Sequence, residues 1–135
     1  MSGTIDFRHD AATDIVFVTP HWTLQTHQDV LLWYQQYVDY CESNFPGRRV
    51  DMIIELSDFH IGPSIAAEWG VYRARVHQSF TRHSCRVNAD LRVRLHVLTS
   101  GARHNVAAQT DEVSTLEEAV KVIEAKRQGA TSSSG

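Results

Sequence analysis

The spacing of apolar positions predicts several strands along the chain. Short β-rich segments at residues 4–8 and 14–19 are separated by polar residues, which indicates two antiparallel strands joined by a turn. Residues 52–56 are almost all apolar, a composition typical of a central strand that is covered on both faces. Apolar and basic residues alternate at 92–98, which predicts another strand, and we expect one more short strand at 105–110.

Three other segments repeat apolar residues at intervals of three and four, the spacing of an amphipathic helix. The first covers residues 26–45, where Thr26 is the predicted N-cap and Pro46-Gly47 ends the helix. The second follows Ser64 and has an apolar stripe, while its charged residues are expected on or beside the other side: Glu68, Arg73, Arg75 and His77. The third begins near Ser114-Thr115-Leu116-Glu117, which has the spacing of a capping box.

The elements follow one another in the order β-β-α-β-α-β-β-α, without an internal repeat. Helices that alternate with strands predict an α/β fold, here a single sandwich with a mixed central sheet of four to five strands and helices packed on it. We expect one domain at residues 4–127. Residues 128–135 contain mostly Gly, Ala, Thr and Ser, and are predicted to form a flexible tail.

Composition narrows the classes of protein that this chain can represent. With 135 residues, 42% of them hydrophobic and 21% charged, the chain is typical of a globular domain, with no predicted membrane span or signal, so we expect a cytoplasmic protein. The net charge of −3 argues against nucleic acid as a partner. The two cysteines and eight histidines lack the spacing of known metal motifs, so no metal site and no cofactor are predicted.

Short motifs accompany this order of elements. Glu55-Leu56-Ser57 follows the central strand, Asp58-Phe59 comes next, Ser64 opens a helix that carries Trp69, and the last helix begins with Leu116-Glu117-Glu118-Ala119. Over residues 4–127 the chain resembles the STAS superfamily, named for sulfate transporters and anti-sigma-factor antagonists, and its SpoIIAA-like branch. The Asp and Gly of the antagonists' Asp-Ser-Ser-Gly signature are missing here. The resemblance implies a regulatory module that a partner kinase phosphorylates on a serine.

The candidate residues for this regulatory role lie in the turn between the central strand and the second helix. Ser57, Asp58 and Ser64 are the candidates for phosphorylation or partner binding. A phosphate on Ser64 would add negative charge at the positive end of a helix dipole. The simpler interpretation is that Ser64 is an N-cap, because Ser is common at that position.

A second group of residues forms a candidate interface: Trp33, Tyr37, Trp69, Arg73 and Arg75. Four aromatic residues fall within eight positions of the first helix, and we expect that they cannot all face one core. Arginine forks can also bind acidic groups, although a solvated surface of mixed charge explains the basic residues more simply. Self-association as a homodimer is the simplest contact that this group predicts.

The leading hypothesis is a non-enzymatic regulatory module that binds another protein, such as a regulatory kinase or signalling protein. The alternative is a domain that binds a small molecule or lipid in a pocket lined by Trp22, Trp33 and Trp69. A membrane surface is a less favoured partner. An enzyme comes last, because Asp58, His60 and Ser64 crowd into one turn, where a catalytic triad rarely attains its geometry.

Overall fold

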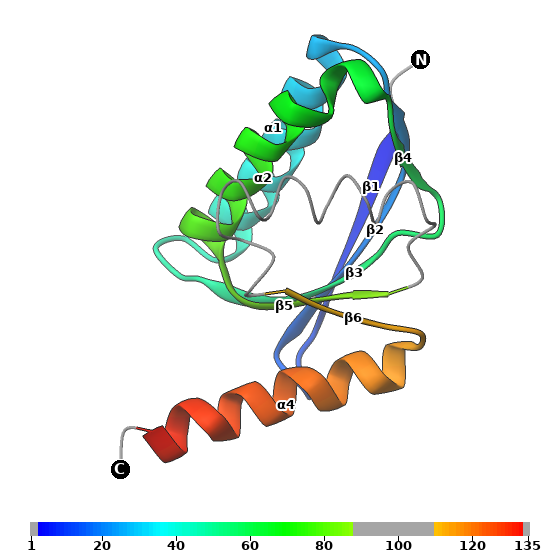
Figure 1. Ribbon diagram of the computed structural model, residues 1–135. Coiled ribbons are helices and arrows are strands. Elements are labelled where there is room, and N and C mark those ends of the chain that lie inside the picture. The colour runs from blue at the N-terminus through cyan, green and yellow to red at the C-terminus, as the bar shows by residue number, and fades with distance from the viewer. Residues whose placement is uncertain (1–2, 88–109, 134–135) are drawn as a thin grey trace.

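The computed structural model describes residues 3–87 and 110–133. Five strands form the main path of a mixed sheet (Figure 1), in the spatial order β1 (Thr4–Asp10), β2 (Ile15–Leu24), β3 (Val50–Glu55), β5 (Thr81–Val87) and β6 (Thr110–Val113). β1 and β2 form an antiparallel hairpin, and the other neighbours along the path are parallel. β3 is paired on both sides, which confirms the interior strand predicted from its apolar run.

Helices cover the two faces of the sheet (Figure 1). On one face lie α1 (His27–Asn44) and α2 (Ala66–Phe80), the latter preceded by a short 3-10 turn, η1 (Pro63–Ile65). On the opposite face lies α4 (Leu116–Ser133). Each face has its own apolar core, the larger one beneath α1 and α2 and a smaller one beneath α4. The α/β fold with a mixed sheet is thus as predicted.

β2 is longer than the sequence predicted. It continues past residue 19 to Leu24, and its last three residues pair with the short strand β4 (Phe59–Ile61). Burial alternates along this extension, since Pro20, Trp22 and Leu24 are buried and the residues between them are exposed. The period-2 pattern was present in the sequence, but Pro20 hid it because proline usually marks the end of a strand.

β5 (Thr81–Val87) was not predicted. Its buried residues include Thr81, Ser84 and Arg86, so a rule that expects apolar residues in an interior strand misses it. The strand predicted at residues 92–98 lies outside the described residues. The strand predicted at 105–110 overlaps the observed β6 only at Thr110, and residues 105–109 also lie outside the described part.

The helix starts follow local side-chain chemistry. Thr26 caps α1 as predicted: its Oγ1 accepts from the Asp29 amide at 3.1 Å, and Asp29 accepts in return from the Thr26 amide at 3.1 Å. At α4 the cap is Thr115, whose Oγ1 accepts from the Glu118 amide at 3.1 Å. The cap predicted at Ser114 therefore lies one residue further along the chain.

α4 also extends beyond the predicted end of the folded domain. The helix continues to Ser133, whereas the sequence predicted a flexible tail from residue 128. Low-complexity composition does not prevent a helix from propagating, because each added residue forms one more backbone hydrogen bond on an existing turn. None of the helices in residues 3–87 and 110–133 combines the length and the apolar character needed to cross a bilayer.

Candidate functional site

A cavity lies between α1, α2 and the sheet; we call it the arginine cavity. Its apolar wall comes from both helices, from β3 and from β4, and includes Trp33, Met52, Ile54, Phe59, Trp69 and Val76. Its polar lining includes Tyr37, Arg73, His77, Thr81 and Arg86. About 30 Å³ is open to the centre of a water molecule, which is room for roughly two waters at about 10–15 Å³ each.

Strand register places Arg86 in this cavity. Arg86 lies beside Ile54 in the parallel pair of β3 and β5, and the neighbouring pair is Met52 with Ser84. Side chains alternate between the faces of a strand, so Cys85 and Val87 contact the core under α4 while Arg86 points the other way. The guanidinium of Arg86 is thereby buried, with 4% of the residue exposed.

Arg73 and His77 reach the same cavity from α2. Arg73 follows Trp69 by four residues, and His77 follows Arg73 by four. All three therefore lie on one stripe of the helix. Arg73 is 6% exposed and His77 is 8% exposed. The prediction that both lie on the polar side of the helix is therefore wrong, because it placed charged residues on the surface by default.

The cavity concentrates positive charge away from water. Burial, followed by the nearby charge of Arg86, lowers the pKa of Arg73 to about 10. Burial, followed by the charges of Arg73 and Arg86, lowers the pKa of His77 to about 3. At neutral pH Arg73 thus keeps its proton and its charge, whereas His77 is a neutral imidazole.

Two donor groups in this region have no acceptor among the described residues. Nη2 of Arg73 and Nε1 of Trp69 are both buried without a hydrogen-bond partner. The Arg73 guanidinium lies 5.8 Å from the centre of the Trp69 ring, which in turn packs against Trp33 at 5.7 Å and Phe59 at 5.9 Å. Buried donors normally find acceptors, so this pair distinguishes the cavity from an ordinary core.

These positions correct the predicted exposure of the candidate interface. Trp33, Tyr37 and Trp69 are 4%, 2% and 3% exposed, and with Arg73 they face the interior. Only Arg75 of that group is on the surface, where its guanidinium lies 4.8 Å from the centre of the Tyr72 ring. Trp33 and Trp69 line the arginine cavity, as the alternative hypothesis predicted for a pocket, but Trp22 is not among the lining residues.

The aromatic residues of α1 all find partners within the chain. Tyr40 stacks on Phe7 of β1 with a centroid separation of 4.3 Å. Tyr34 packs against Tyr72 of α2 at 5.1 Å. Tyr34 and Tyr40 are nevertheless only partly buried, so a partner contact at these rings stays a prediction.

The segment between β3 and α2 is exposed at the candidate residues Ser57, Asp58 and Ser64, whereas Phe59 and Ile61 of β4 are buried within it. Ser57 donates a hydrogen bond to Glu55 at 3.1 Å, and Asp58 contacts Nδ1 of His21 at 2.7 Å. Asp6 contacts the other ring nitrogen of His21 at 3.0 Å. The two carboxylates, that of Asp58 first, raise the pKa of His21. His21 thus connects the hairpin to the turn, and the sequence did not indicate this connection.

Ser64 is exposed but is not a helix cap. It lies inside η1, which begins at Pro63, and the cap positions of η1 and α2 belong to Gly62 and Ile65 without a side-chain hydrogen bond at either. Proline favours the first position of a helical turn, so the cap falls on the residue before Pro63. The predicted N-cap role of Ser64 is therefore wrong.

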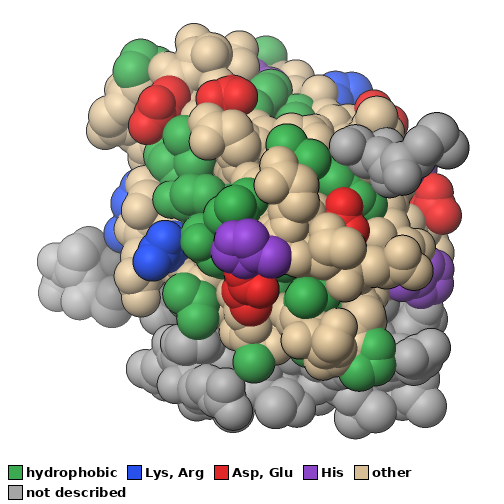
Figure 2. Space-filling model, turned by 90° about the horizontal axis from the view of Figure 1, so that it is seen from above, with side chains coloured by type: hydrophobic (Ala, Val, Ile, Leu, Met, Phe, Trp, Pro, Cys, Tyr) green, Lys and Arg blue, Asp and Glu red, His purple; other side chains and the backbone are tan. Residues whose placement is uncertain are grey.

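Figure 2 views the molecule from above, which is the end where α1 and α2 begin in Figure 1. Hydrophobic side chains lie on this face among polar groups, and acidic, basic and histidine side chains are scattered over it. Here the helices are also joined by an ion pair between His27 of α1 and Glu68 of α2. This end therefore presents a mixed surface beside the exposed turn.

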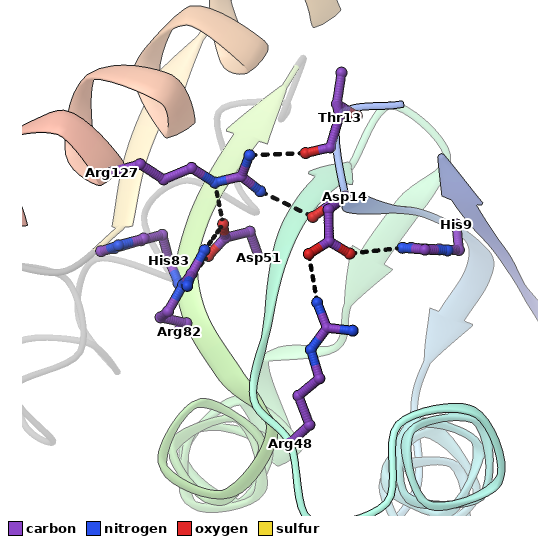
Figure 3. Close-up of polar contacts among 8 residues, drawn as sticks. All are labelled: His9, Thr13, Asp14, Arg48, Asp51, Arg82, His83 and Arg127. Carbon is purple, nitrogen blue, oxygen red and sulfur yellow. Dashed lines mark hydrogen bonds and ion pairs between the residues drawn. The ribbon is translucent and has the colours of Figure 1, made fainter. Parts of the chain in front are cut away.

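A second buried charged group lies on the other face of the sheet (Figure 3). Asp51 of β3 accepts from Arg82 at 2.6 and 3.0 Å, from Arg127 of α4 at 2.6 Å and from the His83 amide at 3.1 Å. Burial alone would raise the pKa of Asp51, but the two arginines outweigh it and hold the pKa below the usual range. Both carboxylate oxygens of Asp51 accept hydrogen bonds. Because Arg127 belongs to α4, these bonds join α4 to the sheet.

No set of three or more His, Cys, Asp or Glu side chains within residues 3–87 and 110–133 is arranged to hold a metal ion. Cys41 and Cys85 are buried on opposite sides of the sheet, and no disulfide joins them. Burial raises the pKa of Cys41 to about 11, which disfavours the reactive thiolate.

The chain matches no protein-family model and no curated protein sequence. Its structure is similar to that of the anti-sigma factor antagonist SpoIIAA in its unphosphorylated form, with a TM-score of 0.57 and 15% sequence identity. The match covers 90% of this chain and 97% of SpoIIAA. The chain therefore has a STAS-like α/β fold, in agreement with the resemblance seen in the sequence.

Proposed function

We propose that the chain is a non-enzymatic regulatory module that binds another protein through the turn at residues 57–64. The observation that supports this most directly is the exposed, anchored turn at the start of α2, on a fold shared with the anti-sigma factor antagonist SpoIIAA. His21 holds Asp58 on one side of the turn, so its polar groups are presented in a fixed arrangement. Fixed polar groups lower the entropy that a partner must overcome on binding.

Ser64 is the proposed site of control by phosphorylation. Its hydroxyl is exposed and is not engaged in a capping hydrogen bond, so a kinase can reach it without opening the fold. A phosphate there would lie at the start of α2, where the helix dipole favours negative charge. The added charge would change the surface that the partner contacts while leaving the core intact.

The outer side of α2 extends this surface. Val71 is 38% exposed, a large fraction for a hydrophobic side chain, and Arg75 is exposed one turn further along the helix. An apolar residue beside an arginine is a combination found at protein interfaces. We propose that this side contributes to the partner contact, with a second copy of the chain as the simplest partner and the cytoplasm as the compartment.

The test is a pull-down from source-cell lysate with tagged wild-type, Ser64→Asp and Ser64→Ala proteins, followed by binding measurements on the captured protein. We expect Ser64→Asp to change affinity by at least about tenfold, or about 1.4 kcal/mol, and Ser64→Ala to change it little. Ser43→Asp adds the same charge at an exposed site in the last turn of α1 and should bind as wild type. Equal binding by all four proteins would refute the switch.

A further inference from the structure

The arginine cavity contains a cation that the described part of the protein does not neutralise. Nη2 of Arg73 is buried without a hydrogen-bond partner, and the described residues that line the cavity include no Asp or Glu. A buried charge is costly unless a charge of opposite sign or hydrogen bonds compensate it. The usual location for an arginine with no partner is the surface, so the burial of Arg73 needs a specific explanation.

The second arginine of the cavity is in a different situation. Glu112 of β6 approaches Arg86, with Nε and Oε2 3.8 Å apart. The charge of Arg86 is therefore opposed by a carboxylate, and it also repels Arg73. His77, the remaining ionisable base in the lining, is neutral at pH 7 because burial and the two arginines lower its pKa to about 3. Among the described residues, the lining of the cavity thus carries one positive charge that no carboxylate opposes.

We propose that the arginine cavity binds a small organic monoanion, a short-chain carboxylate, whose charged end pairs with Arg73 and whose chain contacts the apolar wall. Arginine presents a planar fork of donors that matches the two oxygens of a carboxylate. The unpartnered indole N–H of Trp69 lies in the same region and can donate to the same group. The carboxylate would supply the acceptor that Nη2 of Arg73 lacks among the described residues.

The apolar wall distinguishes a carboxylate from an inorganic anion. Met52, Ile54 and Phe59 offer surface to an alkyl chain, and burying that surface adds to affinity. An inorganic ion such as chloride or sulfate gains nothing from those contacts. The open volume of about 30 Å³ favours a ligand of only a few heavy atoms. This ligand site is internal and does not depend on the proposed partner surface at residues 57–64.

The test uses tryptophan fluorescence, because two of the three tryptophans in the chain, Trp33 and Trp69, line the cavity. The purified protein is titrated with sodium acetate, butyrate and hexanoate, and with sodium chloride and sulfate, all at constant ionic strength. We expect a saturable change for acetate, weaker binding as the chain lengthens to butyrate and hexanoate because the cavity has room for only about two waters, and no change for chloride or sulfate. A melting temperature that rises with the same concentration dependence would give an independent measure of binding.

Two arginine variants on the same helix provide the control. Arg73→Met keeps the length and apolar stem of the side chain without its charge, and should weaken carboxylate binding by about 10–100-fold, the loss of one charged hydrogen-bonding group. Arg75→Met removes an exposed arginine two residues away and should bind within about twofold of wild type, since surface substitutions have small effects. Arg73→Lys keeps the charge without the fork and should be intermediate.

Several outcomes would overturn the proposal. Absence of saturable binding by the wild type excludes a short-chain carboxylate ligand, and equal binding by wild type and Arg73→Met excludes the role of Arg73. Equal responses to chloride and acetate would show a general anion site and reject the carboxylate class. If Arg73→Met does not fold, the wild-type titrations and Arg73→Lys still decide, because a lysine variant that binds like wild type contradicts recognition by the arginine fork.

Discussion

Asp51 and Arg73 are both buried charged residues, and they lie on opposite faces of the same sheet. Asp51 is 1% exposed, and its carboxylate meets two arginines and a backbone amide. Arg73 is 6% exposed, and its Nη2 has no partner within residues 3–87 and 110–133. The first group joins α4 to the sheet, and the second faces a cavity.

The contrast separates two reasons for burying a charge. A carboxylate surrounded by donors contributes to folding, because losing any member leaves the others uncompensated. A guanidinium without an acceptor opposes folding, and a protein that keeps one benefits from it in another way, such as ligand binding. Substitutions at the two positions should therefore have effects of opposite sign.

The largest change in unfolding free energy is expected at Asp51, whose carboxylate has hydrogen-bond partners. Asp51→Asn keeps the size of the side chain but leaves Arg82 and Arg127 facing a neutral amide, so we expect a loss of about 3–5 kcal/mol of unfolding free energy. Urea denaturation measures this loss. Asp39→Asn is the control, since Asp39 is exposed on α1 and pairs only with Gln35, and its effect should stay within about 0.5 kcal/mol. Similar losses for both variants would contradict a structural role for Asp51.

At Arg73 we expect the change in unfolding free energy to have the opposite sign. Arg73→Met removes a buried charge and its repulsion from Arg86 while filling the same space, so the unfolding free energy should rise by roughly 1–4 kcal/mol. The same urea experiment in ligand-free buffer applies. A loss of stability similar to that of Asp51→Asn would mean that Arg73 is as well compensated as Asp51, and the contrast would disappear.

The two sites should also respond to acid in different pH ranges. The pKa of His77 is about 3 in the folded protein and has an ordinary value of 6.5, so the unfolded chain takes up the proton first. The stability from neutral His77 is complete above pH 6.5 and is lost as pH falls toward 3. The folded pKa of Asp51 is below its ordinary 3.8, so its contribution is lost only under more acidic conditions.

Unfolding at pH 7 and pH 5 therefore isolates the cavity. At pH 5 the wild type should lose about 2 kcal/mol through His77, at about 1.4 kcal/mol per pH unit. His77→Gln has no such titration and should lose correspondingly less, while His21, whose raised pKa acts in the opposite direction, is present in both proteins. Equal losses in the two proteins would show that His77 is not held neutral in the cavity.

A smaller contrast of the same kind exists at the helix starts. Thr26 makes a reciprocal capping box with Asp29, so Thr26→Ala should cost about 1 kcal/mol. Ser64 makes no capping hydrogen bond, so Ser64→Ala should cost less than about 0.5 kcal/mol. Thermal melts of the two variants compare them directly, and a cost at Ser64 as large as that at Thr26 would restore the cap interpretation.

Local patterns in the sequence were sufficient for much of the fold. The apolar run at residues 52–56 predicted the interior strand, and Thr26 with the apolar spacing after it predicted α1. Both succeed because an apolar run and a capping residue are patterns among neighbours close in sequence. The segment at residues 57–64 was predicted only as a turn, and the short strand β4 within it, with buried Phe59 and Ile61, was missed.

Those local patterns could not predict the arginine cavity. Arg73 and Arg86 belong to elements that the sequence analysis either misassigned in orientation or did not predict, and their proximity depends on how α2 packs over β5. The spacing of Trp69, Arg73 and His77 was visible in the sequence as one helical stripe. A prediction based on hydrophobicity nevertheless expects arginine on the surface of the protein. The sequence by itself determined the α/β class, the interior strand and the cap of α1. Only the tertiary structure decided which charged side chains are buried and which of them meet a partner, because burial and pairing are properties of residues that lie far apart in the chain.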